Sequence, residues 1–274
     1  MKSPYPVGSP IDMARFRKWS SEFAAYRHSI SEDRIQRWLN QFLTKHHDLA
    51  ARILDCVDFI NHEQINAAFK SLLTSIDGWS PHQAKRKGHW RFVAFSSSAG
   101  ESADAMLHKF RIANNLSSRR YRDLFIYKSD LMNAKLGPED TVVFVDDFSG
   151  TGKQVCDTWS DIQELLPEGP RIFLLLVAAS LKAIKRITNE TDINCSSHIV
   201  LNERENIFSE KSKHFSKEER SYLMQYCIKA DKKMPRGFGE CGLVLVFAHR
   251  CPNNTIPILH VCNSNWEGLF RRYE

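Results

Sequence analysis

The first part of the chain places apolar residues at intervals of three and four, the spacing of one face of a helix. A Ser29-x-x-Glu32 pattern, typical of a capping box, precedes the first such set. An Asp77-Gly78 pair, typical of a helix end, follows the last. The pattern predicts helices at residues 35–43, 49–60 and 61–76. We therefore expect an N-terminal helical segment over residues 1–84, packed as a cap on the rest of the chain.

From Trp90 onward, short apolar segments alternate with helical patterns. The apolar segments predict strands at residues 90–95, 124–127, 141–145, 171–178, 198–201 and 243–248. Helices are expected at residues 101–114, after the third strand as far as about 166, and at 181–188 and 217–230. This alternation predicts an α/β fold with a doubly wound, mostly parallel sheet over residues 85–274. Ligands of such sheets bind at the carboxyl ends of the strands.

The composition is that of a folded, water-soluble protein. Hydrophobic residues make up 42% and charged residues 26% of the 274 residues. The longest apolar run, at residues 172–179, is far shorter than the roughly 20 residues that span a bilayer. The N-terminus has no apolar stretch of the kind found in secretory signals. These features predict a cytoplasmic protein with no membrane segment.

The net charge of +6 is too small to indicate DNA binding by itself, but the basic residues are unevenly distributed. They gather in three clusters: Lys85, Arg86, Lys87 and Arg91; Arg119, Arg120 and Arg122; and Lys182, Lys185 and Arg186. Any one such cluster is usually a solvated surface. Three of them around an α/β core would also suit a polyphosphate ligand.

The segment at residues 142–154, VVFVDDFSGTGKQ, has the features of a phosphate site. Four apolar residues predict a buried strand, and a short turn then opens a helix. Gly150 and Gly152 allow backbone N–H groups to approach an anion closely, and the helix N-terminus adds a favourable dipole. The hydroxyl groups of Ser149 and Thr151 are suited to donate hydrogen bonds to phosphate oxygens.

Two carboxylates stand between the strand and the turn. Asp146 and Asp147 would repel a phosphate, so we expect them to accept hydrogen bonds from a ribose diol. Two other nucleotide motifs do not match, because Walker A needs a serine or threonine where Gln154 stands and the dinucleotide fingerprint needs a glycine at Val155. A plain strand-to-helix turn with acidic residues remains the alternative interpretation.

The segment resembles the phosphoribosyl-pyrophosphate motif of type I phosphoribosyltransferases, in which apolar residues, two acids and a short stretch precede Thr-Gly-x-Thr. Thr151 and Gly152 match the Thr-Gly pair, while Gln154 replaces a threonine that helps to hold the 5′-phosphate. The resemblance assigns catalysis to Asp146 and Asp147, and implies Mg²⁺ as a cofactor that these acids contact through the substrate. It assigns phosphate binding to Ser149, Gly150, Thr151, Gly152, Lys153 and Gln154.

Looser matches extend the resemblance to other segments. The pyrophosphate loop of the family follows its first core strand, the place held here by Ser98, Ala99, Gly100 and Ser102. The resemblance places Asn253 and Asn254 on the base side of the site, although a Pro-Asn-Asn turn explains them equally well. It also implies that residues 202–274 form a hood-like part of the α/β domain.

The order of parts over most of the chain is similar to the phosphoribosyltransferase-like proteins of bacterial conflict systems, the PRTase-CE type, some of which stand beside retron reverse transcriptases. The similarity rests on the helical leader at residues 35–42, the loop and motif above, and the sequence CPNNTIP at residues 251–257. It implies an effector role in antiphage defence, with phosphoribosyl pyrophosphate or a nucleotide as ligand. It also implies a partner protein or ribonucleoprotein.

Three functions remain open on the sequence. The first is an enzyme that transfers a pentosyl group from phosphoribosyl pyrophosphate. The second is a non-catalytic nucleotide sensor or partner-binding module, with which Gln154 is compatible. The third is nucleic-acid binding through the N-terminal helices and the basic stretch at residues 202–236, which is compatible with either of the others.

Overall fold

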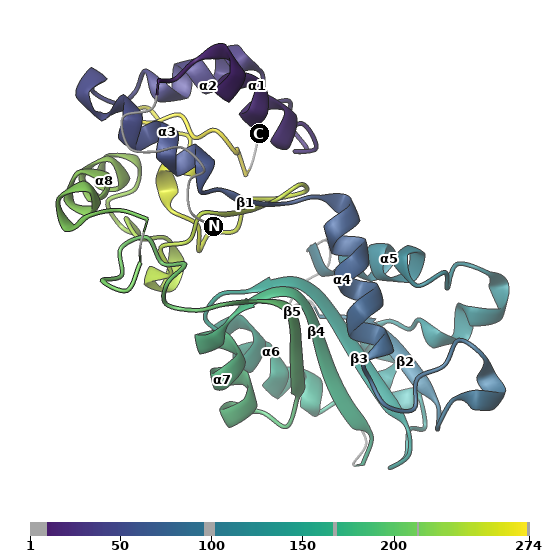
Figure 1. Cartoon of the computed structure of the whole chain (residues 1–274). Coiled ribbons are helices and arrows are strands. Elements are labelled where there is room, and N and C mark those ends of the chain that lie inside the picture. The colour runs from purple at the N-terminus through teal and green to yellow at the C-terminus, as the bar shows by residue number, and fades with distance from the viewer. Residues whose placement is uncertain (1–9, 96–101, 167–168, 213, 273–274) are drawn as a thin grey trace. The chain divides into compact units, whose positions relative to one another are not determined.

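The computed structural model describes residues 10–95, 102–166, 169–212 and 214–272. The chain divides into two compact units (Figure 1). The first unit combines Met1–His62 with Asn202–Glu274, and the second holds Glu63–Leu201. This division differs from the boundary near residue 84 expected from the sequence. The reason is that the N-terminal helices and the C-terminal segment, although far apart in sequence, share one hydrophobic core.

The first unit joins short helices to a two-stranded parallel ladder. Its helices are α1 (Met13–Glu22), α2 (Glu32–Leu39), α3 (His47–Asp55) and α8 (Lys217–Ala230), with 3-10 turns at Thr44–His46, Phe238–Glu240 and Pro257–Leu259. Strand β1 (Asp58–Ile60) pairs with β6 (Leu245–Phe247). The core holds the large side chains of Trp19, Trp38 and Trp266, which are almost completely buried.

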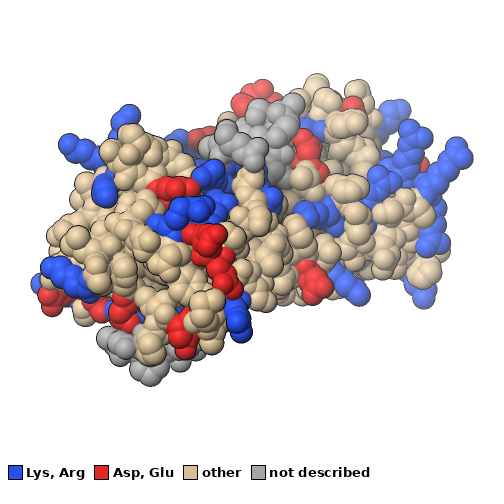
Figure 2. Space-filling model, turned by 90° about the horizontal axis from the view of Figure 1, so that it is seen from above, with Lys and Arg blue, Asp and Glu red and all other residues tan. Residues whose placement is uncertain are grey.

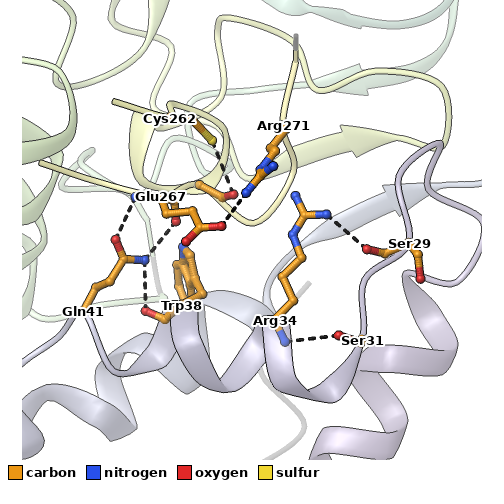
Figure 3. A network of polar contacts seen from close by, with 9 residues as sticks. Ser29, Ser31, Arg34, Trp38, Gln41, Cys262, Glu267 and Arg271 are labelled. Carbon is orange, nitrogen blue, oxygen red and sulfur yellow. Dashed lines mark hydrogen bonds and ion pairs between the residues drawn. The ribbon is translucent and has the colours of Figure 1, made fainter. Parts of the chain in front are cut away.

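Trp38 of α2 and Gln41, two residues beyond the end of this helix, are bonded to the C-terminal segment; the bonds of Gln41 are drawn in Figure 3. The indole N–H of Trp38 donates to the carbonyl of Ile258 at 2.8 Å. The Gln41 side chain both donates to the carbonyl of Glu267, at 2.9 Å, and accepts from its N–H, at 2.7 Å. The Glu267 carboxylate also pairs with Arg271 at 2.5 Å. The bonds of Trp38 and Gln41 join parts of the chain more than 200 residues apart, which explains why the first unit is discontinuous in sequence.

The structure corrects three predictions for this unit. The Ser29 capping box does not form, because α2 begins after Ser31, whose hydroxyl accepts from the N–H of Arg34 at 3.3 Å. The predicted second helix ends at Asp55, and Asp58–Ile60 is extended because its backbone pairs with β6. The predicted strand at residues 243–248 is shorter than expected and belongs to this ladder, not to the main sheet.

The second unit is a four-stranded parallel sheet with helices on both faces (Figure 1). The strands lie in the order β2 (Trp90–Ala94), β3 (Thr141–Ser149), β4 (Arg171–Ser180) and β5 (Asn194–Leu201). The helices are α4 (His62–Thr74), α5 (Ser102–Ala113), α6 (Lys153–Gln163) and α7 (Leu181–Glu190), with 3-10 turns at Gln83–Lys85, Arg119–Leu124 and Lys128–Asn133. The predicted α/β fold with a parallel sheet is confirmed.

Aromatic contacts show how the two faces of this sheet are covered. On one face, the ring of Phe144 in β3 lies 6.1 Å from that of Trp159 in α6. On the other, the ring of Phe92 in β2 lies 5.0 Å from that of Phe110 in α5, which in turn contacts Phe69 of α4. Burial on both faces accounts for the continuous apolar runs of β3 and β4. No helix within the described ranges is long and apolar enough to cross a bilayer.

The order in which successive segments are added to the sheet reverses between β2 and β3. The strand predicted at residues 124–127 is reduced to one parallel bridge between Phe125 and Phe92, with the N–H of Ile126 donating to the carbonyl of Phe92 at 3.3 Å. This bridge lies on the side of β2 away from β3. The chain therefore moves outward through α5, and then returns to β3 and continues through β4 and β5. Ligands of doubly wound sheets bind at such a switch point, beyond the carboxyl ends of the strands.

Candidate functional site

The carboxyl end of β3 projects past one of its neighbours. Pairing with β2 ends where Ala94 faces Val145, whereas pairing with β4 continues to Ser149. Asp146 and Asp147 lie on this projecting part. Because side chains alternate along a strand, the two carboxylates lie on opposite faces of the sheet. The sequence placed these acids at the end of the strand, and the structure places them just before that end, beside the switch point.

The two carboxylates have different surroundings. Asp147 is buried, with 8% of its surface exposed, and Asp146 is half-buried. One carboxylate oxygen of Asp146 accepts from the N–H of Asp147 at 2.8 Å, which holds that side chain close to its own backbone. The pair therefore offers acceptor oxygens on both sides of the strand end, an arrangement suited to hydroxyl groups of a ligand.

Gly152 makes the turn between β3 and α6. Its φ of 72° lies in the left-handed region, and it caps the N-terminus of α6, which begins at Lys153. A Cβ atom at this position would lie 2.9 Å from the carbonyl oxygen of Ala183 and 3.2 Å from the Cβ of Arg186, both in α7. The sequence suggested that this glycine exposes backbone N–H groups. The structure gives it a further function, because only a glycine lets the turn pack this close to α7.

A serine that sequence analysis did not single out holds the same turn. The hydroxyl of Ser180, at the end of β4, donates to the carbonyl of Gly150 at 2.6 Å and accepts from the N–H of Ala183 at 2.9 Å. Ser180 is also the N-cap of α7. A serine directly before a helical pattern is the signal that identifies such a cap. Ser180 therefore fixes the turn to the start of the next helix.

The predicted phosphate residues lie together in this turn, but their side chains differ in accessibility. Ser149 is buried, and Thr151 is half-buried with its hydroxyl accepting from the N–H of Lys153 at 3.3 Å. Lys153 and Gln154 are exposed on the first turn of α6. Lys153 forms an ion pair with Asp157, one turn further along α6. The backbone and hydroxyl groups of the turn are therefore the best placed of these groups for an anion at the helix N-terminus.

The predicted pyrophosphate loop lies largely outside the described residues. Ser98, Ala99 and Gly100 fall in the range that the structure does not describe, and Ser102 is the first residue of α5. The ends that flank this loop are described, because β2 ends at Ala94 immediately before it. Since β2 and β3 are adjacent and parallel, the carboxyl end of β2 lies beside that of β3. The N-termini of α5 and α6 follow these two strand ends.

The two predicted base-side residues belong to the first unit. The Asn254 side chain is buried and donates to the carbonyl of Phe238 at 3.0 Å, with the Cys241 sulfur at 3.4 Å. The carbonyl of Asn253 accepts from the N–H of Phe238 at 2.7 Å. These contacts give Asn254 a local role in shaping the turn that precedes β6.

Of the three basic clusters, only that of Lys182, Lys185 and Arg186 begins at the carboxyl ends of the strands, where the turn between β3 and α6 also lies. Lys182, in the first turn of α7, follows the carboxyl end of β4, whereas the stretch from Lys85 to Arg91 precedes or begins β2 at the opposite edge. Arg186 of the α7 cluster pairs with Glu190 at 3.0 Å. This hydrogen-bonded pairing raises the pKa of Arg186. Within the described ranges, no group of three or more His, Cys, Asp or Glu side chains is placed to hold a metal ion.

Comparison with known proteins identifies the family. The family model described as PRTase-CE matches residues 35–272, which is most of the chain. The protein therefore belongs to the PRTase-CE family and is phosphoribosyltransferase-like. The match includes the second unit and most of the first, and it covers the turn between β3 and α6. No curated protein matches the chain.

Proposed function

We propose that this phosphoribosyltransferase-like protein binds phosphoribosyl pyrophosphate, or a related nucleotide, at the turn between β3 and α6. The observation that carries the proposal is the projecting end of β3, where two carboxylates precede a glycine turn and a helix N-terminus at the switch point of the sheet. Membership of the PRTase-CE family supports the same class of ligand. The proposal keeps the cytoplasmic location expected from the sequence.

Each part of the turn has a role in this proposal. Asp146 and Asp147 accept hydrogen bonds from the two ribose hydroxyls, which are the donors that carboxylates bind well. The backbone N–H groups at the start of α6, with the hydroxyl groups of Ser149 and Thr151, receive the 5′-phosphate. The loop between β2 and α5 takes the pyrophosphate, because it begins at the neighbouring strand end.

The residues of the site fit a Mg²⁺ ion that arrives with the substrate. Mg²⁺ usually keeps several waters and binds one or two carboxylates together with substrate phosphates. In this proposal Asp146 and Asp147 contact the ion indirectly, through the substrate whose ribose hydroxyls they bind. Bound in this way, the ion would neutralise charge on the pyrophosphate.

The reaction we propose is pentosyl transfer. A ring nitrogen of a base forms a bond to C1 of the ribose, while the bond from C1 to pyrophosphate breaks and its electron pair leaves with the pyrophosphate. The base releases its N–H proton to solvent. Because C1 acquires oxocarbenium character, the carboxylates beside the ribose stabilise positive charge, and the helix N-terminus keeps the 5′-phosphate in place.

A second candidate function is a nucleotide sensor that uses the same site without catalysis. It is favoured by Gln154, which stands where type I phosphoribosyltransferases have a phosphate-binding threonine. In either form, we propose an effector role in a bacterial antiphage system, with a partner protein or ribonucleoprotein. Release of pyrophosphate in the presence of a panel of bases distinguishes the enzyme from the sensor. Binding without release supports the sensor.

Calorimetric titration of phosphoribosyl pyrophosphate with Mg²⁺ tests the site. We expect saturable binding to the wild type and affinity at least about tenfold lower in Asp147→Asn, because hydrogen bonds to a charged acceptor are lost. The matched control is Asp161→Asn, an exposed carboxylate on α6, which keeps wild-type affinity. Failure of the wild type to bind at millimolar ligand, or equal loss in both variants, contradicts the proposal.

A further inference from the structure

A cavity of the parallel-sheet unit opens at the amino-terminal ends of the strands, opposite to the turn between β3 and α6. It has a volume of about 660 Å³ and lies at the start of β2, between the segment that precedes this strand and the 3-10 turn Arg119–Leu124. Trp90, the first residue of β2, lines the cavity and pairs with Thr141. Asp146 lies five residues further along β3, so the two sites are separated by about 17 Å along the strand. The cavity is therefore distinct from the turn at β3 and α6.

The charge of this cavity is positive. Arg86, Arg91 and Arg120 line it, together with Asp123 and two histidines. Among the described residues, no carboxylate forms an ion pair with any of the three arginines. Lysine and arginine side chains also gather at the right of Figure 2, over the part of this unit that holds α5 and the turns after it. The cavity thus combines concave shape with unpaired positive charge.

The three guanidinium groups are held in place by neutral neighbours. Arg86 donates to the carbonyl of Ser80 at 2.9 Å and stacks on the ring of Trp79, 4.8 Å from its centre. Arg91 donates to the carbonyl of Trp90 at 2.9 Å. A guanidinium group has five N–H donors, so each of these contacts leaves donors for a ligand. Partial burial lowers the pKa of Arg86, and an anion in the cavity would offset the lost hydration of this cation.

The aromatic rings near the cavity are already covered. Arg120 lies over the ring of Tyr121, 4.6 Å from its centre, and Arg86 covers Trp79. Trp90 is fully buried and donates its indole N–H to the carbonyl of Lys87 at 2.8 Å. These rings are therefore not available as stacking platforms for a base. The ligand would be recognised by its phosphate groups instead, and arginine is the residue best suited to them.

We propose that this cavity binds the oligophosphate group of a small ligand through Arg86, Arg91 and Arg120. Its volume lies within the range of about 300–1,000 Å³ typical of small-molecule pockets. The site is independent of the ligand proposed for the turn at β3 and α6. It gives the protein a second phosphate-binding position, on the same sheet but at the amino-terminal ends of its strands.

Calorimetric titration of inorganic tripolyphosphate into the full chain, without divalent cations, tests this site. We expect saturable binding that becomes at least about tenfold weaker in the double variant Arg91→Gln/Arg120→Gln, because two charge-assisted contacts are removed. The matched control is Arg122→Gln, an exposed arginine on the same 3-10 turn that does not line the cavity. Thr151→Val, at the other site, is expected to leave this binding unchanged.

Three outcomes would overturn the proposal. The first is no saturable binding of tripolyphosphate to the wild type at millimolar concentration. The second is an equal loss of affinity in Arg122→Gln and in the double variant, which would indicate a diffuse electrostatic effect. The third is a single-stranded oligonucleotide that binds through Arg91 and Arg120 and is not displaced by tripolyphosphate, which would make a nucleic-acid strand the ligand.

Discussion

Replacement of Gly152 by alanine tests the geometry of the turn at the centre of the candidate site. The φ of 72° costs a residue with a Cβ about 1–2 kcal/mol. The new Cβ would also lie 2.9 Å from the carbonyl oxygen of Ala183, which belongs to the backbone of α7 and cannot rotate away. Restoring an ordinary contact requires a shift of the turn or of α7, at a cost of about 1–3 kcal/mol. We therefore expect Gly152→Ala to lower the free energy of unfolding by about 2–5 kcal/mol.

The matched control for this prediction is Gly137→Ala. Gly137 does not have a left-handed φ, and a Cβ there meets only a carboxylate oxygen of Asp140 at 4.0 Å. Its replacement should be neutral or stabilise the protein by up to about 1 kcal/mol, because the unfolded chain loses freedom. Urea unfolding followed by circular dichroism measures both effects. If Gly152→Ala unfolds at the same urea concentration as Gly137→Ala, the explanation of this turn is wrong.

Two further predictions concern buried titratable side chains of the first unit, Asp55 and His260. Asp55→Ala should lower the free energy of unfolding in urea by about 3–5 kcal/mol, because Asp55 pairs with the fully buried Arg15 at 2.5 Å. The control Asp157→Ala breaks an exposed pair and should lower it by no more than about 1 kcal/mol. Similar losses in the two variants would contradict this reasoning. Burial lowers the pKa of His260 from 6.5 to about 4. As the pH drops from 6.5 to 4, the imidazole is therefore protonated in the unfolded chain before it is protonated in the folded chain. The free energy of unfolding should fall over this range by at most about 3 kcal/mol. His260→Gln should flatten this part of the pH profile of urea unfolding, and an unchanged profile would exclude His260 as its cause.

The sequence predicted the second unit well because its strands are long apolar runs and its helices have clear spacing. The order of strand, turn and helix from β3 to α6 is confirmed, although β3 continues to Ser149, four residues beyond the predicted end at residue 145, because its pairing with β4 continues to that residue. The partner of Gly152 was not predictable, because Ala183 lies about thirty residues further along the chain. Ser180 was missed for the same reason, although its place before a helical pattern indicated a cap.

The first unit was harder to predict because its contacts join distant parts of the chain. Strands β1 and β6 have three residues each, too few for a periodic pattern, and apolar residues in β1 continued the spacing of the preceding helix. Two serines near the start of α2 were both suitable caps, and the structure uses Ser31. The shared core of the leader and the tail follows from bonds such as that between Trp38 and Ile258, which no local pattern reveals.

The measurement that tests the central claim most directly is amide hydrogen exchange of the full chain with and without phosphoribosyl pyrophosphate and Mg²⁺. A ligand held at the N-terminus of α6 protects the N–H groups that receive its phosphate. The account predicts slower exchange in wild-type peptides that cover residues 146–155 when the ligand is present, and a smaller slowing of the same peptides in Asp147→Asn at the same ligand concentration. Protection confined to other parts of the chain, or none at saturating ligand, would contradict the assignment of this turn as the binding site.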